Sequence, residues 1–558
     1  MPSSTPRATT PADATTAETV DVIVVGSGAA ALTAALTAAS GGLSVLVLEK
    51  SDRIGGTSAM SGAGTWIPLN HHARAAGYAD SEDEVLTYMR AASREGWAEE
   101  EGNLWRAFVA NAPRMLAFVE RVTPLRYELI PQPDPQAECP GGKTIGRMVS
   151  PKPISRRVVG RYASRIRRST LPHIFSYREM VSYDPYHAPA LTGLRLLPRL
   201  TWRWLTNAAG QGNALITGLL KGCLDAGCHV ELGVRVTELI QDEDGRIIGV
   251  RAEQNGKPVS FACTRGVVLA TGGFEWDAAM RDAHFPGTFD RYGSPSTNEG
   301  DGHRMAAQAG ARLERMDQAL MHPTMPTRYD GRLHGMPNTF QAEPHAIVVN
   351  RYGRRFVSEY DYNIGEALDR RDPVTGEALH LPAWMIADSR FLKQAPLAFR
   401  WYASYDRGWV HKAPTLHALA RQIEVPADAL AETVARFNGF CAAGRDADFH
   451  RGESAWERYK AGHSTAINGN PTLKPIERPP FLAIPLNRSL LGTKGGPCTT
   501  PRGEVVRQDG RVIPGLFCAG NLMANPIGTR AIGAGTTIGP VMTWGYICAR
   551  TLLGNREP

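Results

Sequence analysis

The chain has 558 residues, too many for one simple core, so we expect two or more domains. Its composition, 43% hydrophobic and 21% charged residues, is typical of a globular protein and excludes a disordered or fibrous one. The net charge of +7 would permit an acidic partner, but no basic-aromatic repeat or zinc-type spacing accompanies it. The sequence therefore argues against nucleic-acid binding.

Residues 1–18 are rich in Ala, Thr, Ser and Pro, which is typical of a disordered tail and not of a signal peptide. No uninterrupted apolar segment approaches the length of a membrane span. The eight cysteines are scattered without a C-x-x-C pair, which indicates reduced thiols more than a disulfide framework. We therefore expect a cytoplasmic protein without metal ligands.

A buried strand, a tight turn and the start of a helix are predicted at residues 22–39. Gly26 permits the turn, Gly28 lets backbone N–H groups approach a pyrophosphate, and the small Ala31 lets the helix pack on the strand. A second apolar run ends in Glu49, about 20 residues downstream, where a ribose hydroxyl needs an acceptor. Together these elements predict a dinucleotide site and not a turn that only packs.

A loop rich in glycine and hydroxyl side chains follows, at residues 50–64. Such a loop offers N–H and O–H donors with little side-chain bulk, which suits the phosphates of a cofactor and the polar edge of its ring. A surface loop without function is the alternative. Its position directly after Glu49 favours the cofactor.

Residues 80–122 have helical spacing, and residues 150–206 combine a basic segment with an apolar one. The apolar part, between Leu191 and Trp204, holds several leucines and tryptophans. A segment with this pattern could rest on a membrane surface and admit a lipophilic substrate. It is also typical of a solvated face beside ordinary core, which is the interpretation we favour.

The next elements complete a first domain. A helix is predicted from Gly210 to Asp225, then a strand at residues 227–232 and a hairpin whose turn lies at residues 242–245. A buried strand at residues 266–273 ends in glycines. Residues 276–488 differ in kind, with mixed short elements and a helix at residues 426–440, and are predicted to form a second domain.

Further strands are predicted within residues 503–521, and a helix starts after Ala534 with its free N–H groups facing the same site. We therefore expect residues 19–275 and 489–558 to form one nucleotide-binding domain that residues 276–488 interrupt.

Over residues 20–552 the chain resembles the flavoprotein family of fumarate reductases and 3-ketosteroid dehydrogenases. The motifs that carry the resemblance are GSGAAA with Glu49, GGTSAMSGAG (55–64), VTELI (236–240), LATGGF (269–274), GDGHRMA (300–306), GRRFVSE (353–359), GTKGG (492–496), LFCAGN and GTTIGP. WIP at residues 66–68, TPLRY at residues 123–127 and GTKGG are nearer to the ketosteroid dehydrogenases. The resemblance implies an α/β fold, in which a Rossmann-like FAD-binding domain of the glutathione-reductase type is interrupted by an α+β substrate-binding cap.

The resemblance implies noncovalent FAD, since relatives that attach flavin through a histidine carry it near the glycine loop, where Thr57 stands here. The helix after Gly535 would direct its positive dipole at the flavin N1 and O2. The candidate cofactor-binding residues are Gly26, Gly28, Ala29, Ala30, Glu49, Lys50, Gly55, Gly56, Thr57, Ser58, Ser61, Gly62, Val236, Ala270, Thr271, Gly272, Gly520, Asn521, Gly535, Thr537 and Ile538.

In ketosteroid 1-dehydrogenases a backbone N–H and a tyrosine polarise a ketone, a second tyrosine removes the alpha proton, and the beta hydride passes to flavin N5. By motif, Gly535 matches the backbone donor and Tyr362 the proton-abstracting tyrosine, although a shift in alignment would exchange Tyr362 with Tyr360. The polarising tyrosine is replaced by Ala531, and residues 131–138 lack a tyrosine that the family has there. Arg530 could act on a carbonyl or carboxylate instead, or could pair with an acid or the flavin phosphates.

The sequence therefore predicts an FAD-dependent dehydrogenase that introduces a C=C bond alpha,beta to the ketone of an apolar cyclic substrate, a 3-ketosteroid or a smaller ring. One alternative is a flavin-dependent ene or fumarate-type reductase of an activated alkene, and another is a flavin- or ligand-binding protein without catalysis. No second dinucleotide fingerprint is evident, so the predicted electron acceptor is a quinone, another carrier or oxygen and not NAD.

Overall fold

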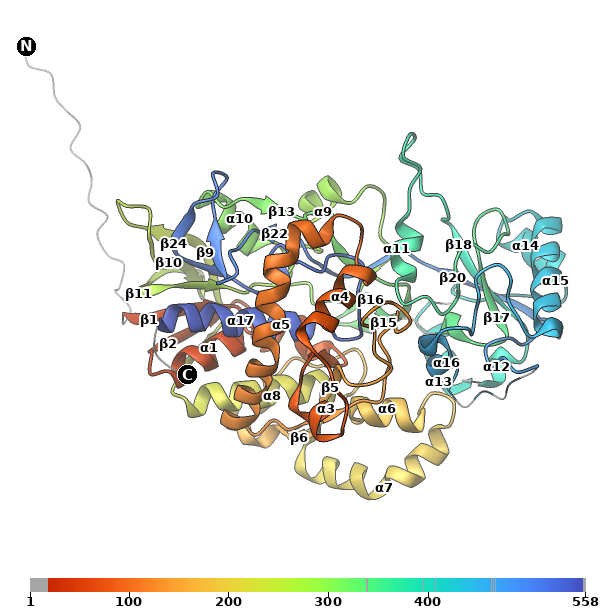
Figure 1. The fold of residues 1–558 in the computed structure, drawn as a ribbon, viewed down its shortest axis with the longest axis horizontal. Helices are drawn as coiled ribbons and strands as arrows, with labels where there is room; N and C mark the ends of the chain where they lie inside the picture. Colours follow the sequence, from red (N-terminus) through yellow and green to blue (C-terminus); the bar gives the residue numbers. More distant parts are fainter. Residues whose placement is uncertain are drawn as a thin grey trace, which may run out of the picture.

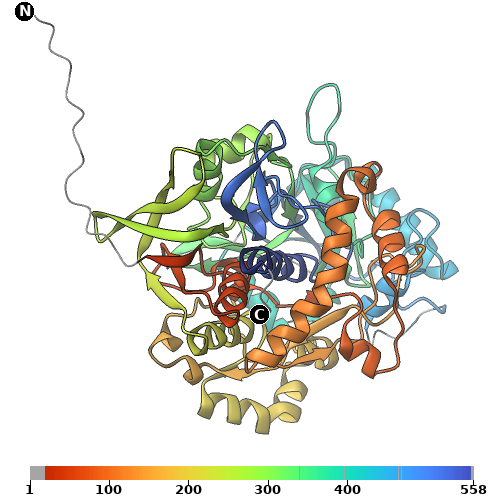
Figure 2. The same ribbon diagram turned by 60° about the vertical axis from the view of Figure 1, so that its left-hand side comes forward.

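The computed structural model of the protein describes residues 19–337, 340–394, 396–406, 408–462, 464, 466 and 468–554. The tail predicted for residues 1–18 lies outside the described residues. Two bodies of secondary structure lie side by side, and the larger contains both the first and the last elements of the chain (Figures 1 and 2).

An eight-stranded sheet forms the centre of the larger body. Its strand β1 (Val20–Val25) pairs in parallel with β2 (Val45–Glu49) and β11 (Lys257–Leu269). The strands β1 and β2 are almost wholly apolar because a parallel sheet is covered on both faces. The other members are β8 (His229–Leu232), β9 (Val234–Gln241), β10 (Ile247–Gln254), β23 (Glu504–Val506) and β24 (Val512–Cys518). Because β24 pairs with β11, the two ends of the chain share one sheet.

The predicted hairpin is confirmed, since β9 and β10 pair antiparallel. Gly245, in the turn between them, has a φ of +75°, which suits glycine at this position.

Helix α1 (Ala29–Ser40) packs on both α8 (Gln211–Asp225) and α17 (Ile538–Leu553) beside this sheet (Figure 1). The helix α1 is rich in alanine and buried from Ala29 to Ala39, so backbones can approach it closely. At Gly545 of α17, a Cβ atom would lie 2.3 Å from the carbonyl oxygen of Ala30. The first and last long helices of the larger body therefore make close backbone contact.

The helices predicted within residues 80–122 are α4 (Glu82–Ala92) and α5 (Trp97–Val122), and α5 packs on α17. A small sheet beside them joins β3 (Thr65–Trp66), β4 (Tyr127–Leu129) and β5 (Met148–Pro151). This sheet carries the end of the second glycine-rich loop.

The smaller body is built on an antiparallel sheet in the order β17-β18-β20-β19. Its strands are β17 (Ala346–Val349), β18 (Ala383–Ala387), β19 (His411–Ala413) and β20 (Phe481–Leu486). The helices α14 (Leu416–Gln422) and α15 (Ala427–Ala443) pack beside it, and α15 confirms the helix predicted at residues 426–440. A separate hydrophobic core around Ile347, Leu430 and Phe437 stabilises this body.

Residues 276–337 connect the two bodies. The strand β21 (Ser489–Thr493) pairs with β12 (Arg291–Tyr292) and β14 (Ala319–Met321). The helix α10 (Asp301–Gln308), which we expected in the second domain, packs Met305 and Ala306 into the core of the larger body.

The basic and apolar segments of residues 150–206 lead into two helices, α6 (Tyr177–Tyr183) and α7 (Pro189–Thr206), and α7 lies at the lower edge of the molecule in Figure 1. The side chains of Leu194 and Trp204 are 72% and 80% exposed, respectively. The ordinary-core interpretation is therefore wrong for these residues, because α7 buries one face only. Within the described residues, no helix combines the length and the apolar composition needed to cross a bilayer.

Candidate active site

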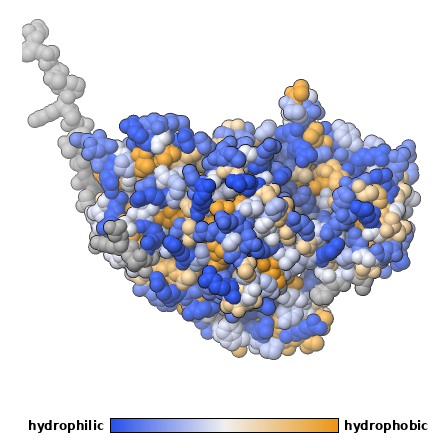
Figure 3. Space-filling view, in the orientation of Figure 1, coloured by the Kyte–Doolittle hydropathy of each residue, from blue (hydrophilic) through white to orange (hydrophobic). Residues whose placement is uncertain are grey.

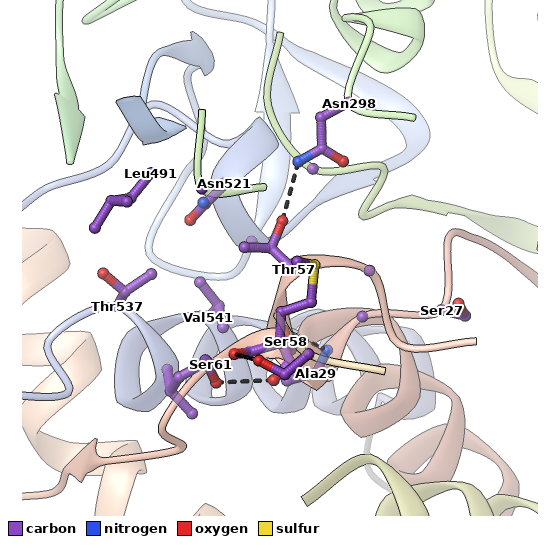
Figure 4. A pocket seen from close by; sticks show the side chains of 18 of the residues that line it. Ser27, Ala29, Thr57, Ser58, Ser61, Asn298, Leu491, Asn521, Thr537 and Val541 are labelled. Carbon is purple, nitrogen blue, oxygen red and sulfur yellow. Dashed lines mark hydrogen bonds between the residues drawn. The ribbon is translucent and has the colours of Figure 1, made fainter. Parts of the chain in front are cut away.

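A cavity of about 750 Å³ lies at the carboxyl ends of β1, β2 and β11 and is also lined by residues that connect to the smaller body, among them Leu320 and Leu491. The carboxyl edge is where parallel sheets bind ligands. Figure 4 shows Thr57 and Ser58 on one side of the cavity, with Asn521 and Thr537, from the last part of the chain, on another. The cavity is therefore built by segments that lie far apart in the sequence.

The first glycine-rich loop forms one wall of the cavity. Gly26 has a φ of +109°, and a Cβ atom there would lie 2.4 Å from the carbonyl oxygen of Ala270. No other residue type fits this turn between β1 and α1. The N–H of Ala29 donates to Ser58 Oγ at 3.1 Å, so the first loop is tied to the second.

Glu49 ends β2 on the cavity wall and is 9% exposed. Its carboxylate accepts hydrogen bonds from Ser27 Oγ at 2.6 Å and from the Ser51 N–H at 2.9 Å. Ser27 Oγ in turn accepts from the Gly55 N–H at 2.9 Å. Each carboxylate oxygen has a second lone pair, so the oriented Glu49 can still accept from a ribose hydroxyl.

The second glycine-rich loop contains the short helix α2 (Gly56–Met60). Asn298 Nδ2 donates to Thr57 Oγ1 at 3.0 Å and to Glu275 Oε1 at 2.8 Å. Gly55 has a φ of +111° and lies behind the cavity wall, where it positions α2. The loop thus presents hydroxyl groups to the cavity, and hydrogen bonds from Asn298 to Thr57 and from Ala29 to Ser58 fix its position.

Lys50 lines the cavity, but its ammonium group forms ion pairs with Glu299 at 2.9 Å and with Asp301 at 2.7 Å. Arg235, which also lines the cavity, pairs with Asp301 at 2.8 Å. The charge predicted to face a cofactor is therefore largely neutralised by neighbouring carboxylates.

Two buried oxygen atoms on the cavity wall, Thr271 Oγ1 and Asn521 Oδ1, have no hydrogen-bond partner among the described residues. Buried polar atoms are normally paired, so these two fit a site that binds a polar molecule. Thr537 and Ile538 begin α17 on the same wall, and the first N–H groups of a helix have no partner within it. This end of α17 would favour negative charge on a bound ring.

The structure brings most of the predicted cofactor-binding residues to this one cavity. Those that line it are Gly26, Gly28, Ala29, Ala30, Glu49, Lys50, Gly56, Thr57, Ser58, Ser61, Gly62, Val236, Ala270, Thr271, Gly272, Gly520, Asn521, Thr537 and Ile538. Gly55 and Gly535 lie outside its lining, as do Tyr360, Tyr362 and Arg530.

Tyr362 contacts the loop that contains Gly535, at Gly533 and Ala534. Tyr362 Oη donates to the carbonyl oxygen of Gly533 at 3.3 Å. Gly535 has a φ of +86°, and a Cβ atom there would lie 2.6 Å from Gly64, so the second loop and the C-terminal loop touch. Burial raises the pKa of Tyr362 above its ordinary value, with a further contribution from Tyr177.

Tyr360 lies in different surroundings from Tyr362. Its ring packs on the guanidinium of Arg451, 4.9 Å from the ring centroid, and its hydroxyl is buried without a partner among the described residues. The side chain is thus directed into the smaller body and not toward the loop that holds Gly535.

Arg530 forms an ion pair with Glu366, in which Nε lies 3.0 Å from Oε2, and its side chain is 37% exposed. Glu366 also pairs with Arg94 at 3.0 Å. Of the two roles that the sequence left open, the geometry favours pairing with an acid. The neighbouring Ala531 is held by Asn363, whose Oδ1 accepts from the Ala531 N–H at 2.8 Å.

Sequence reasoning missed a tyrosine cluster next to Tyr362. Tyr177 lines the cavity and packs with Tyr362 in one hydrophobic cluster, together with Ile130, Met148 and Ala534. Tyr177 Oη donates to Gln132 Oε1 at 3.1 Å, and Tyr459 Oη donates to the same oxygen at 3.3 Å. Burial raises the pKa of Tyr177 to about 12. Tyr177 thus connects the cavity with the cluster that holds the predicted base.

His173, a second residue that the sequence did not indicate, lines the cavity and is buried. Burial lowers its pKa to about 4, so the imidazole is neutral at pH 7. Its Nδ1 accepts from the Asn213 N–H at 3.3 Å, which orients the ring.

Comparison with known proteins decides between the kinds of ligand that this cavity could hold. The family model of the FAD binding domain matches residues 21–538. The chain belongs to this family. FAD is therefore its cofactor, as the sequence predicted, and the glycine loops, Glu49 and the start of α17 are arranged as such a ligand requires.

The chain is also similar over nearly its whole length to named dehydrogenases. It is 38% identical to 4-oxocyclohexanecarboxylate 2-dehydrogenase of Sinomonas cyclohexanicum, covering 96% of this chain and 93% of that protein. It is 35% identical to 3-oxosteroid 1-dehydrogenase of Mycolicibacterium smegmatis, covering 96% of this chain and 97% of that protein.

A solved structure agrees with these relatives. That of 3-ketosteroid delta1-dehydrogenase from Sterolibacterium denitrificans, in complex with 1,4-androstadiene-3,17-dione, matches with a TM-score of 0.87 and 33% identity, covering 96% of this chain and 99% of that one. The family resemblance, the fold class and the assignment as an FAD-dependent oxidoreductase are therefore confirmed.

Proposed function

We propose that this protein desaturates an apolar cyclic ketone, removing one hydrogen from the alpha carbon and one from the beta carbon. Two relatives, at 38% and 35% identity, are named for an oxocyclohexane carboxylate and for 3-oxosteroids. The observation that carries the proposal is the hydrogen bond between Tyr362 and Gly533 at 3.3 Å, which holds a phenol beside the loop of Gly535. Bound FAD supplies the acceptor for the beta hydride.

Two groups of the chain would act on the ketone. The N–H of Gly535 would polarise the carbonyl oxygen, and the phenolate form of Tyr362 would take the alpha proton. Negative charge develops on the ketone oxygen as that proton leaves, and one lost oxyanion donor costs about 3 kcal/mol. Ala531 supplies no hydroxyl group to the ketone oxygen. The Gly535 N–H would therefore contribute a larger share of the stabilisation than it would in a site with a second donor.

Tyr177 is a positioning residue in this proposal. Its ring contacts the glycine loop, because a Cβ atom on Gly62 would lie 3.3 Å from that ring. Its hydroxyl is fixed by Gln132, as is that of Tyr459. Tyr177 therefore orders the wall between the cavity and Tyr362, and excludes water from the base.

We also propose the division of labour between the segments. Residues 19–275 and 489–558 would hold FAD noncovalently, and residues 276–488 would cover the substrate. The shared sheet and the separate core of the smaller body support this assignment. Residues 301–311 would belong with the FAD-binding part, since α10 packs into its core.

The reductase alternative has less support, because binding a dicarboxylate needs several cations at one place. Among the described residues that line the cavity, the Lys and Arg side chains are Lys50 and Arg235, and Asp301 pairs with both. A neutral ketone therefore fits this lining better than a dianion.

We propose an external electron acceptor, a quinone or another carrier, and a cytoplasmic location. The first follows from the missing second dinucleotide fingerprint in the sequence. The second is supported by the eight cysteines, which are all free thiols in the structure.

Anaerobic titration of the FAD-loaded enzyme with saturated cyclic ketones tests the function. The probes are a 3-oxosteroid, 4-oxocyclohexanecarboxylate and the methyl ester of the latter. We expect a neutral ketone to bleach the oxidised flavin and the corresponding enone to form. If only an enone reacts, by reoxidising chemically reduced flavin, the enzyme is a reductase; spectral shifts without bleaching would indicate a binding protein.

A further inference from the structure

Helix α7 presents an apolar surface to solvent. The members of this α7 surface are Leu191, Leu194, Leu197, Trp202, Trp204 and Leu205, whose side chains are 48%, 72%, 56%, 51%, 80% and 56% exposed, respectively. Hydrophobic residues appear along the lower margin of the molecule in Figure 3, where Figure 1 places α7. Soluble proteins rarely expose so many large apolar side chains on one helix, so this surface indicates a contact with something outside the chain.

The opposite face of α7 is firmly attached. Thr192, Leu196 and Arg203 are buried there. The guanidinium of Arg203 pairs with Glu179 at 2.6 Å and donates to the carbonyl oxygen of Ile174 at 2.7 Å. The helix therefore cannot turn its leucines and tryptophans inward without breaking a buried ion pair, and their exposure is a fixed property of the fold.

The segment of the sequence that contains α7 is strongly basic. The helix contains no acidic residue and carries Arg195 and Arg199 among its apolar side chains. Arg199 also pairs with Glu179 at 3.3 Å, and its side chain stays 60% exposed. Earlier in the same segment of the sequence, Arg157, Arg161 and Arg168 are exposed. Across residues 151–210, the basic side chains far outnumber the acids Glu179 and Asp184, and Glu179 is already buried against Arg203.

We propose that the α7 surface docks the protein on an anionic phospholipid bilayer. Leucines and tryptophans on a helix with arginines between them match the interface of such a bilayer, since the apolar side chains enter the acyl boundary while the arginines meet the lipid phosphates. A second copy of the chain fits less well. A symmetric contact would place two basic surfaces against each other, where their charges repel.

The same surface adjoins the wall of the cavity. Ile174 is 46% exposed and also lines the cavity, and Pro185 and Tyr186, shortly before α7, line it too. A lipophilic ketone dissolved in the bilayer could therefore reach the cavity without crossing water. This last step rests on the proposed function, whereas docking on lipid does not.

Flotation of the FAD-loaded enzyme with vesicles tests the proposal. The vesicles contain phosphatidylcholine alone or phosphatidylcholine with phosphatidylglycerol. We expect the protein to float with the phosphatidylglycerol vesicles and much less with the neutral ones. The triple variant Leu194→Ser/Trp204→Ser/Leu205→Ser should lower the bound fraction at least about tenfold, because each side chain contributes apolar area to the contact.

A matched control removes three exposed apolar side chains, including one tryptophan, from the smaller body. It is Tyr352→Ser/Val374→Ser/Trp401→Ser, at positions that are 54%, 91% and 59% exposed. This variant should float as the unchanged protein does. Flavin content and reduction by a ketone in vesicle-free buffer are measured on all three proteins, so a failure of lipid binding is distinguished from a failure of the proposed function.

Three results would overturn the proposal. The first is an unchanged protein that does not float with phosphatidylglycerol vesicles, and the second is an α7 triple variant that floats equally well. The third is a dimer in vesicle-free buffer that the α7 variant converts to a monomer, since the surface would then belong to a second copy of the chain.

Discussion

Tyr360 and Tyr362 lie two residues apart but contact different parts of the protein. Tyr362 reaches the carbonyl of Gly533 and packs with Tyr177, while Tyr360 packs on Arg451 inside the smaller body. Both phenols are buried, and burial raises the pKa of each. Burial alone therefore cannot identify the base, whereas the distance to the C-terminal loop favours Tyr362.

Substituting each tyrosine in turn tests whether Tyr362 or Tyr360 is the base. Tyr362→Phe should leave FAD bound but slow flavin reduction by the ketone at least about a hundredfold, the usual effect of losing an acid–base group. Tyr360→Phe is the matched control and should stay near the normal rate, because its hydroxyl has no partner to lose among the described residues. Anaerobic stopped-flow absorbance measures both rates. Near-normal reduction by Tyr362→Phe would remove it from the mechanism.

The pH dependence of flavin reduction gives a second test at the same residue. A base acts in its deprotonated form, and burial raises the pKa of Tyr362 above the ordinary value of 10.0. The rate of reduction at low ketone concentration should therefore rise with pH and keep rising beyond pH 10, as long as the protein stays folded. A plateau that begins below pH 8 would assign the base to another group.

The elements that the sequence predicted correctly are those that depend on local backbone rules. The turn at Gly26, the acid at Glu49 and the hairpin at residues 242–245 follow from neighbouring residues, and each is present in the structure. The cluster of Gln132, Tyr177 and Tyr459 could not be predicted in this way. Its members come from three separate segments, which tertiary packing alone brings together.

Helix α7 illustrates a different limit. The spacing of its leucines and tryptophans fits both a buried and an exposed position. Amphipathic spacing is the same whether or not a second element covers the apolar face. The catalytic assignments also remain predictions, since a motif places Tyr362 and Gly535 in the sequence but does not show what they contact when a ketone is bound.

The contact between the first and last helices of the larger body can be tested at Gly545. Adding a Cβ atom there would bring it 2.3 Å from the backbone of Ala30, so Gly545→Ala should push α17 away from α1 and lower the free energy of unfolding by about 1–3 kcal/mol. The start of α17 should shift with it and release FAD more readily. Chemical denaturation and the flavin content after gel filtration measure the two effects.

Gly439 provides the control for this substitution. It lies inside α15, and a Cβ atom there would have no atom within 4 Å. Gly439→Ala should therefore leave FAD binding unchanged and stabilise the helix by about 0.5–1 kcal/mol. Equal effects of the two variants would show that Gly545 is not needed for close packing.

The segment that carries α7 is linked to the smaller body through His187. Its Nδ1 lies 2.6 Å from a carboxylate oxygen of Asp184, and its Nε2 lies 2.7 Å from one of Glu343. Both ring nitrogens thus face acceptors, which favours the protonated form. The hydrogen bonds with Asp184 and Glu343 raise the pKa of His187 to about 10.

This link should weaken in alkaline solution. The folded-state pKa of about 10 lies above the ordinary value of 6.5, so the stabilisation by His187 is complete below pH 6.5 and is lost as the pH rises toward 10. We expect His187→Gln to be less stable than the unchanged protein at pH 6, with a difference that shrinks steadily up to pH 10. Urea denaturation across this range measures it, and Glu343→Gln should reproduce the same trend because it removes one of the two negative charges that face the imidazolium. A difference that stays constant with pH would show that His187 contributes by packing and not by its charge.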